Sequence, residues 1–184
     1  MEDVSALKRE AEAIVAELGL LDVTGRYGRA EVVGSVALDL IVKLDIDIHL
    51  LVDSPDLLAM TDRVYHALLD HPRIREVRIT DYRAEGGVKI GIDAHPAPSG
   101  VWSIDIWITD RVETTAFAYV RRLLQRLTPE HRAAILAIKR AYHARGELRD
   151  GISRRVYDAV VDKGVRSEDE FRRYLEWERR GSLV

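Results

Sequence analysis

The sequence predicts an α+β (α/β) fold: a mixed sheet with flanking helices over residues 1–110, followed by a helical module over residues 111–184. Segments with strand-like alternation occur only before Asp110, whereas the segments after it show helical periodicity. The charge changes at the same place. Residues 1–110 hold 20 acidic and 11 basic residues, a balance of −9, and residues 111–184 hold 11 acidic and 17 basic residues, a balance of +6. We therefore expect a core and a separate helical module.

An amphipathic helix is predicted at the start of the chain. Residues Val4–Leu18 place apolar side chains on one face at helical spacing. Gly19 follows, where glycine often ends a helix. The short apolar run Ala30–Val33 ends at Gly34, and we expect it to be a strand that leads into a turn.

The next segment alternates between polar and apolar residues. Leu44–Val52 has period two in its first half and is then wholly apolar, which predicts a strand with one partly polar face. Ser54-Pro55 is a good helix start because proline suits the first turn, and this helix runs to about Leu69.

Three further strands precede Asp110. Ile74–Asp81 alternates, Gly86-Gly87 forms a turn, and Val88–Ala94 is the partner strand. Val101–Ile108 is the last strand. Four helices are then predicted, over Glu113–Leu127, Pro129–Arg145, Ser153–Lys163 and Ser167–Arg179, the last starting with a Ser167/Glu170 capping box.

Composition excludes several classes of protein. The chain has no cysteine, which rules out disulfides, thiolate metal sites and cysteine nucleophiles. No apolar run reaches the roughly 18–20 residues that span a bilayer, and none resembles a signal peptide, so we expect cytoplasmic residence and no membrane partner. The net charge of −3 argues against broad nucleic-acid binding.

Three acids on predicted strands form the most informative set. Because strand side chains alternate between faces, Asp45 and Asp47 share one face, where their like charges repel unless something neutralises them. Asp105 lies in a similar setting, between apolar residues on a later strand. If the two strands pair, three carboxylates converge, and such hard oxygen ligands suit Mg²⁺ or Mn²⁺.

Gly34 and Ser35 follow the first predicted strand. The glycine lets the backbone approach a phosphate closely, and the serine offers a hydroxyl and a main-chain N–H. The residues that follow are expected to open a short helix, whose N-terminus attracts anions.

The order of these features resembles the nucleotidyltransferase superfamily typified by DNA polymerase beta. The shared pattern is an apolar strand, Gly-Ser, about ten residues, Asp-x-Asp on a strand, and a third acid on a later strand. The resemblance implies a nucleotidyltransferase-like mixed sheet, with residues 1–110 as the catalytic core. It also implies that two metal ions and a nucleoside triphosphate bind, and that a nucleotidyl group is transferred with loss of pyrophosphate.

The resemblance also assigns roles to residues. Asp45 and Asp47 would be metal ligands, and Asp105 would be the third ligand and would help to deprotonate an acceptor. Gly34 and Ser35 would hold the phosphates. The chain departs from the family pattern at two positions: family members often have glycine where this chain has Asp39, and often have serine where it has Leu44.

The helical module resembles the helical domain of archaeal CCA-adding enzymes and oligoadenylate synthases. Lys139 matches a lysine that meets the triphosphate in those proteins, and Gly151–Ser153 loosely matches a loop. Arg154 and Arg155 are weaker phosphate candidates. The acidic and basic halves would suit an active site in a cleft between them.

Two side chains near the acids have simpler interpretations. His49 shares the face of Asp45 and Asp47, and we favour a polar packing role over metal ligation. Trp102 and Trp107 flank Asp105, and core packing is favoured for both, although Trp107 shares the face of Asp105.

The predicted function is Mg²⁺- or Mn²⁺-dependent transfer of a nucleoside monophosphate from a triphosphate such as ATP to a hydroxyl-bearing acceptor. A small molecule such as an antibiotic, or a protein, is expected as the acceptor, rather than nucleic acid. Two alternatives stay open: a non-catalytic nucleotide-binding or interaction module on the same fold, and an RNA-end nucleotidyltransferase.

Overall fold

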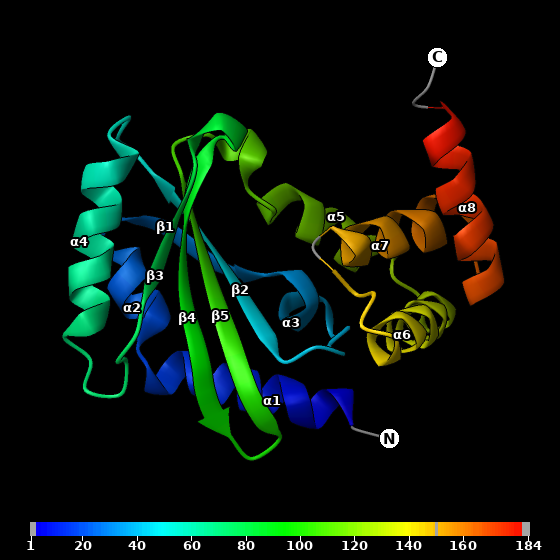
Figure 1. Cartoon of the computed structure of the whole chain (residues 1–184), viewed down its shortest axis with the longest axis horizontal. Coiled ribbons are helices and arrows are strands. Elements are labelled where there is room, and N and C mark those ends of the chain that lie inside the picture. Colours follow the sequence, from blue (N-terminus) through cyan, green and yellow to red (C-terminus); the bar gives the residue numbers. More distant parts are fainter. Residues whose placement is uncertain (1–2, 150, 182–184) are drawn as a thin grey trace. The chain divides into compact units, whose positions relative to one another are not determined.

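The structure is a computed structural model that describes residues 3–149 and 151–181. It divides into two compact units, residues 1–121 and residues 122–184, and the boundary falls within helix α5 (Phe117–Arg126) (Figure 1). Each unit has its own buried core, so each is described by itself.

A five-stranded mixed sheet forms the centre of the first unit. Its strands lie in the order β1-β2-β5-β4-β3. Strands β2 and β5 pair in parallel, whereas the other three pairs are antiparallel. The strands are β1 (Gly28–Val33), β2 (Asp45–Val52), β3 (Arg78–Tyr82), β4 (Gly87–Ala97) and β5 (Gly100–Thr109). The mixed sheet predicted from the sequence is therefore confirmed.

Helices cover one face of this sheet. They are α1 (Val4–Glu17), α2 (Leu20–Gly25) and α4 (Leu57–Leu69), the blue to cyan helices beside the strands in Figure 1. Alternation along β2 decides which residues they cover, because Ile46, Ile48 and Leu50 are fully buried while the residues between them are only half-buried. The apolar face thus holds the core and leaves the acids on the opposite face.

Local structure differs from the sequence-based expectation at several elements, and α4, for example, begins after its N-cap Asp56 rather than at Ser54-Pro55. Helix α2 was not predicted; it starts because Gly19 takes a left-handed conformation, φ +58°, that ends one helix and lets another begin. Strand β3 starts at Arg78 rather than at residue 74. Strand β4 continues through Pro96, which lies beyond an irregularity in the ladder between Ile92 and His95.

The second unit contains α6 (Pro129–Ala144), α7 (Ile152–Lys163) and α8 (Glu168–Gly181), together with the end of α5. Helix α5 begins at Phe117, after a 3₁₀ turn, and not at residue 113 as expected. Ser167 caps α8 by accepting the N–H of Glu170. The Glu170 carboxylate accepts the N–H of Arg166 instead of closing the predicted box on Ser167.

None of the helices that the structure describes combines the length and the apolar character needed to cross a membrane.

Candidate functional site

The parallel pairing of β2 with β5 brings the three predicted acids together on one face of the sheet. Asp47 lies directly opposite Asp105, and Asp45 lies opposite Ser103 in the same register. Neighbouring strands in a sheet are about 4.8 Å apart, so Asp47 and Asp105 are adjacent side chains. All three acids are half-buried. The sequence placed Asp45 and Asp47 on one face, and the structure adds the register that brings Asp105 beside them.

Gly34 meets the acids from the neighbouring strand. Val33, the last residue of β1, is paired with Asp47, so the turn at Gly34 lies next to that carboxylate. Gly34 has φ +64°, a left-handed conformation that favours glycine. A Cβ atom placed on Gly34 would overlap the Asp47 side chain. Two independent constraints, conformation and close approach, therefore require glycine here.

Ser35 lies in the first turn of the short helix α3 (Gly34–Leu38), as the sequence predicted. The residue is 7% exposed, and its hydroxyl has no hydrogen-bond partner among the described residues. A buried hydroxyl without a partner costs about 1–3 kcal/mol. This cost is recovered when a ligand accepts the hydrogen bond, as a phosphate oxygen does.

Asp39 ends the same turn in a conformation that explains the departure from the family pattern. Its backbone has φ +56°, the left-handed region that glycine adopts readily. Aspartate is among the few other residues that tolerate this region, so the turn forms without glycine. Lys8 of α1 forms an ion pair of 2.7 Å with the Asp39 carboxylate. Leu44, the second departure, packs beside Gly100.

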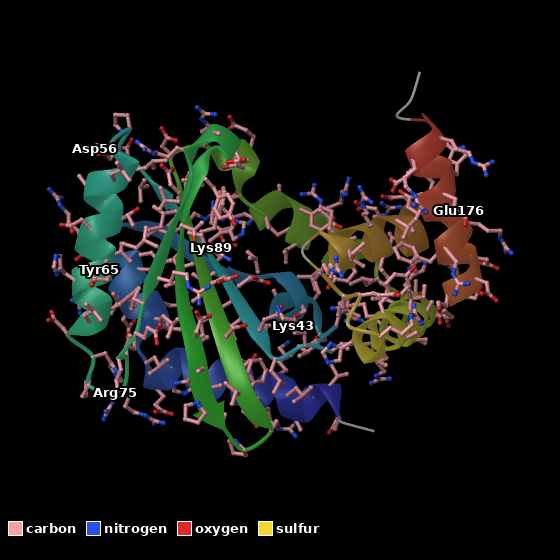
Figure 2. The ribbon with its side chains drawn as sticks, viewed as in Figure 1. Lys43, Asp56, Tyr65, Arg75, Lys89 and Glu176 are labelled. Atoms are coloured by element: carbon pink, nitrogen blue, oxygen red, sulfur yellow. The ribbon has the colours of Figure 1, made fainter. Side chains whose placement is uncertain are left out.

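Two lysines that the sequence analysis did not single out contact the acids. Lys43 Nζ lies 3.3 Å from Asp45 Oδ2, and Lys89 Nζ lies 3.1 Å from Asp105 Oδ2. Both lysines are labelled in Figure 2, Lys43 just before β2 and Lys89 on β4. Each lysine offsets the negative charge of the acid that it contacts. The sequence offers only a weak sign of these two lysines: lysine is scarce in this chain, which has only five.

The acids have the chemistry of a hard-cation site, but their side chains do not form one as they stand. Within residues 3–149 and 151–181, no three His, Asp or Glu side chains are arranged so that they could hold a metal ion. Asp45, Asp47 and Asp105 nevertheless offer only carboxylate oxygens, the donors that Mg²⁺ and Mn²⁺ prefer, from adjacent backbone positions.

Aromatic side chains continue the acid face beyond Asp105. Trp107 lies opposite His49 in the β2–β5 register, and their ring centroids are 6.4 Å apart. Tyr82 approaches Trp107 from the other side, at 5.8 Å. Trp102, in contrast, faces the core, where its indole N–H donates to Glu10 at 2.8 Å. The two tryptophans therefore differ, and only Trp107 lies on the face of Asp105.

His49 packs rather than pairing with the acids. Its Nδ1 accepts the backbone N–H of Ala116 at 3.1 Å, which places the imidazole proton on Nε2. Burial lowers the pKa of His49 to about 4, so the ring is neutral at pH 7. The polar packing role predicted for this histidine fits these contacts.

The cationic candidates of the second unit differ in burial, because Lys139 is buried whereas Arg154 and Arg155 are exposed. Lys139 on α6 is 2% exposed, and its ammonium group donates to the Tyr157 hydroxyl of α7 at 3.0 Å. It is therefore not an ordinary surface lysine of a helix. Arg154 and Arg155 are exposed and lie about 4 Å from acidic partners on α7 and α8.

No protein-family model and no curated protein matches the chain, whereas solved structures share its fold. The Cid1 poly(U) polymerase with MgGTP bound aligns with a TM-score of 0.55 and 20% identity over 73% of this chain and 43% of that chain. A cytoplasmic RNA terminal U-transferase aligns with a TM-score of 0.55 and 18% identity, over 73% of this chain and 41% of that one. The Cid1 poly(U) polymerase is a member of the nucleotidyltransferase superfamily. The chain has the nucleotidyltransferase fold.

The nucleotidyltransferase fold confirms the fold class and the resemblance that the Gly-Ser, Asp-x-Asp and Asp pattern predicted. The chain spans less than half the length of the matched structures. One of them is Cid1 in complex with its short product ApU, with a TM-score of 0.55. The expectation that nucleic acid is not a partner therefore has no support from these neighbours.

Proposed function

We propose that this chain is a Mg²⁺- or Mn²⁺-dependent nucleotidyltransferase that moves a nucleoside monophosphate from a triphosphate to a hydroxyl-bearing acceptor and releases pyrophosphate. One observation carries the proposal: the acids Asp45, Asp47 and Asp105 share a sheet face that begins at the Gly34 turn. A structural role alone gives no reason to gather three carboxylates beside a glycine turn and a buried hydroxyl without a partner.

The acids carry the chemistry in this proposal. Asp45, Asp47 and Asp105 would hold the divalent cations, which when bound would neutralise the phosphate charge and lower the pKa of the acceptor hydroxyl. Asp105 accepts the hydroxyl proton as the acceptor oxygen attacks the α-phosphorus. The bond from that phosphorus to the bridging oxygen breaks, and pyrophosphate leaves with its electron pair. Catalysis is then mostly positioning and charge neutralisation.

The Gly34 turn holds the triphosphate. Gly34 lets the backbone approach the phosphates, and the Ser35 hydroxyl donates the hydrogen bond that it lacks within the described chain. Lys139 is proposed to add a positive charge to the phosphates. ATP is among the triphosphates to be tested.

Two classes of acceptor are proposed, each supported by different observations. The single small helical module and the mild net charge of −3 favour a small molecule, such as an antibiotic, or a protein. An RNA 3′ end is the second candidate, favoured by Trp107 and Tyr82 beside the acid face, because aromatic rings stack on bases. The structural neighbours include an RNA terminal U-transferase, which adds weight to this candidate. Cytoplasmic residence stays part of the proposal.

Label transfer tests the proposal directly. The chain is incubated with each α-labelled ribonucleoside triphosphate, Mg²⁺, and one acceptor at a time: a short RNA, an aminoglycoside, or a protein extract. We expect transfer to one acceptor class, pyrophosphate release, and loss of both in Asp105→Asn. Salt-sensitive binding of the short RNA would favour the RNA end.

Metal-dependent triphosphate binding without transfer to any of these acceptors would favour the non-catalytic module instead. The stability of the Asp45→Asn variant shows whether the acids are needed for the fold itself. Asp45→Asn relieves the repulsion with Asp47 but also breaks the exposed pair with Lys43, so the stability of the metal-free chain should stay within about 1 kcal/mol of wild type. Strong destabilisation would mean that the acids are structural.

A further inference from the structure

Lys89 lies on the same face of the sheet as Asp45, Asp47 and Asp105, and it contacts Asp105. It lies on β4 opposite Trp107, one diagonal step from Asp105, and its side chain is 29% exposed. The position directly opposite Asp105 is Gly91, which has no side chain. Because nothing fills that position, Lys89 reaches the Asp105 carboxylate across it, at 3.1 Å.

Lys89 approaches Asp105 from the side opposite to Asp47. Strand β5 lies between β2 and β4, so Asp47 is on one side of Asp105 and Lys89 is on the other. The oxygen of Asp105 that meets Lys89 is therefore turned towards β4. Lys43 holds Asp45 in a comparable way at 3.3 Å, but it is exposed and lies only two residues from its partner.

We propose that Lys89 is a built-in counterion that competes with the metal for Asp105, so that this ion pair must open before Asp105 can turn towards Asp47. The inference rests on the proposed function. It accounts for a set of three adjacent acids that do not form a metal cage as they stand. It also makes Lys89 a positioning residue, which sets how tightly the acids hold a divalent cation.

Mn²⁺ binding to the whole chain, without nucleotide, tests the inference by electron paramagnetic resonance of the free ion. Lys89→Met keeps the length of the side chain and removes its charge, and we expect its Mn²⁺ affinity to rise about three- to tenfold. Lys89→Arg keeps the charge and should remain close to wild type. Lys43→Met should give a smaller rise, because Lys43 is more exposed.

Arg83→Met is the matched control. It also removes one positive charge from a pair with an aspartate, Asp81, in the same unit, but that pair does not touch the three acids. We expect its Mn²⁺ affinity to equal that of wild type. An equal rise in the Mn²⁺ affinity of Arg83→Met would show that the change in net charge alone causes the effect, and it would overturn the inference.

Thermal unfolding provides a second measurement. Without metal, Lys89→Met should unfold at a lower temperature than wild type, and added Mn²⁺ should raise its unfolding temperature by more than that of wild type. Unchanged or weaker Mn²⁺ binding by folded Lys89→Met overturns the inference and leaves the proposed function standing. Absence of Mn²⁺ binding by wild type and variant also overturns it, and label transfer then decides separately on the proposed function.

Discussion

Removal of the buried Ser35 hydroxyl is expected to stabilise the folded chain and to weaken triphosphate binding. Ser35→Ala removes a hydroxyl that has no partner among the described residues, so the free energy of unfolding should rise by about 1–3 kcal/mol. Triphosphate affinity should fall about ten- to a hundredfold, because hydrogen bonds to charged groups contribute about 1.5–3 kcal/mol. Urea unfolding and calorimetric titration measure the two effects. A loss of stability with unchanged affinity would contradict this role.

Gly34 permits a comparison with a second glycine of similar conformation. Gly34→Ala should lower the free energy of unfolding by about 2–5 kcal/mol, from backbone strain together with overlap on the Asp47 side chain. Gly146 has a similar φ, +68°, but nothing lies within 4 Å of its Cβ position. Gly146→Ala should therefore show the strain alone, about 1–3 kcal/mol. Equal losses in urea unfolding would show that the close approach to Asp47 is not a constraint.

At the scale of elements, His49 ties β2 to the start of α5 through the Ala116 N–H. Burial lowers the pKa of His49 to about 4 from an ordinary value of 6.5. Between these values the unfolded chain binds a proton that the folded chain does not. The stability from neutral His49 is thus full above pH 6.5 and is lost as the pH falls towards 4.

We expect wild type to lose roughly 2–3 kcal/mol more than His49→Gln over this pH range. Urea unfolding at several pH values between 7.5 and 4 measures this difference, because the other titrating groups are common to both chains. Parallel stability curves for wild type and variant would mean that His49 titrates normally in the folded chain.

The elements also show what sequence patterns can and cannot predict. Period-two alternation correctly placed Asp45 and Asp47 on one face, because this pattern is local. The contacts of Lys43 and Lys89 were missed for different reasons. Lys89 meets Asp105 only through the register between β4 and β5, which joins residues 16 apart and leaves no local signal. Lys43 is close in sequence, but its orientation depends on the backbone before β2.

Backbone conformation explains most of the remaining differences. The left-handed turn at Gly19 restarts a helix that periodicity alone did not separate from the first one. Asp39 stands where family members often have glycine, yet its φ of +56° preserves the turn. The left-handed conformation of Asp39 is not encoded in the pattern of hydrophobic residues, so that pattern does not predict it.

At the scale of the whole molecule, Lys139 tests whether the second unit takes part in nucleotide binding. Lys139→Met replaces a buried ammonium group by an apolar side chain of similar length and removes its hydrogen bond to Tyr157, so the free energy of unfolding should fall by about 1–3 kcal/mol. Triphosphate affinity should fall about tenfold, through loss of a charged contact. Lys163→Met, on the exposed end of α7, is the control and should bind as wild type does. Equal affinity in all three chains would restrict the binding site to the first unit.

The central claim is that the acids and a divalent cation together bind the triphosphate. Calorimetric titration of the four ribonucleoside triphosphates, each with and without Mg²⁺, tests it most directly, with wild type compared against the Asp45→Asn/Asp47→Asn double variant. We predict binding of at least one triphosphate that requires both Mg²⁺ and the two acids. Binding that is the same without Mg²⁺, or in a folded double variant, would contradict the claim.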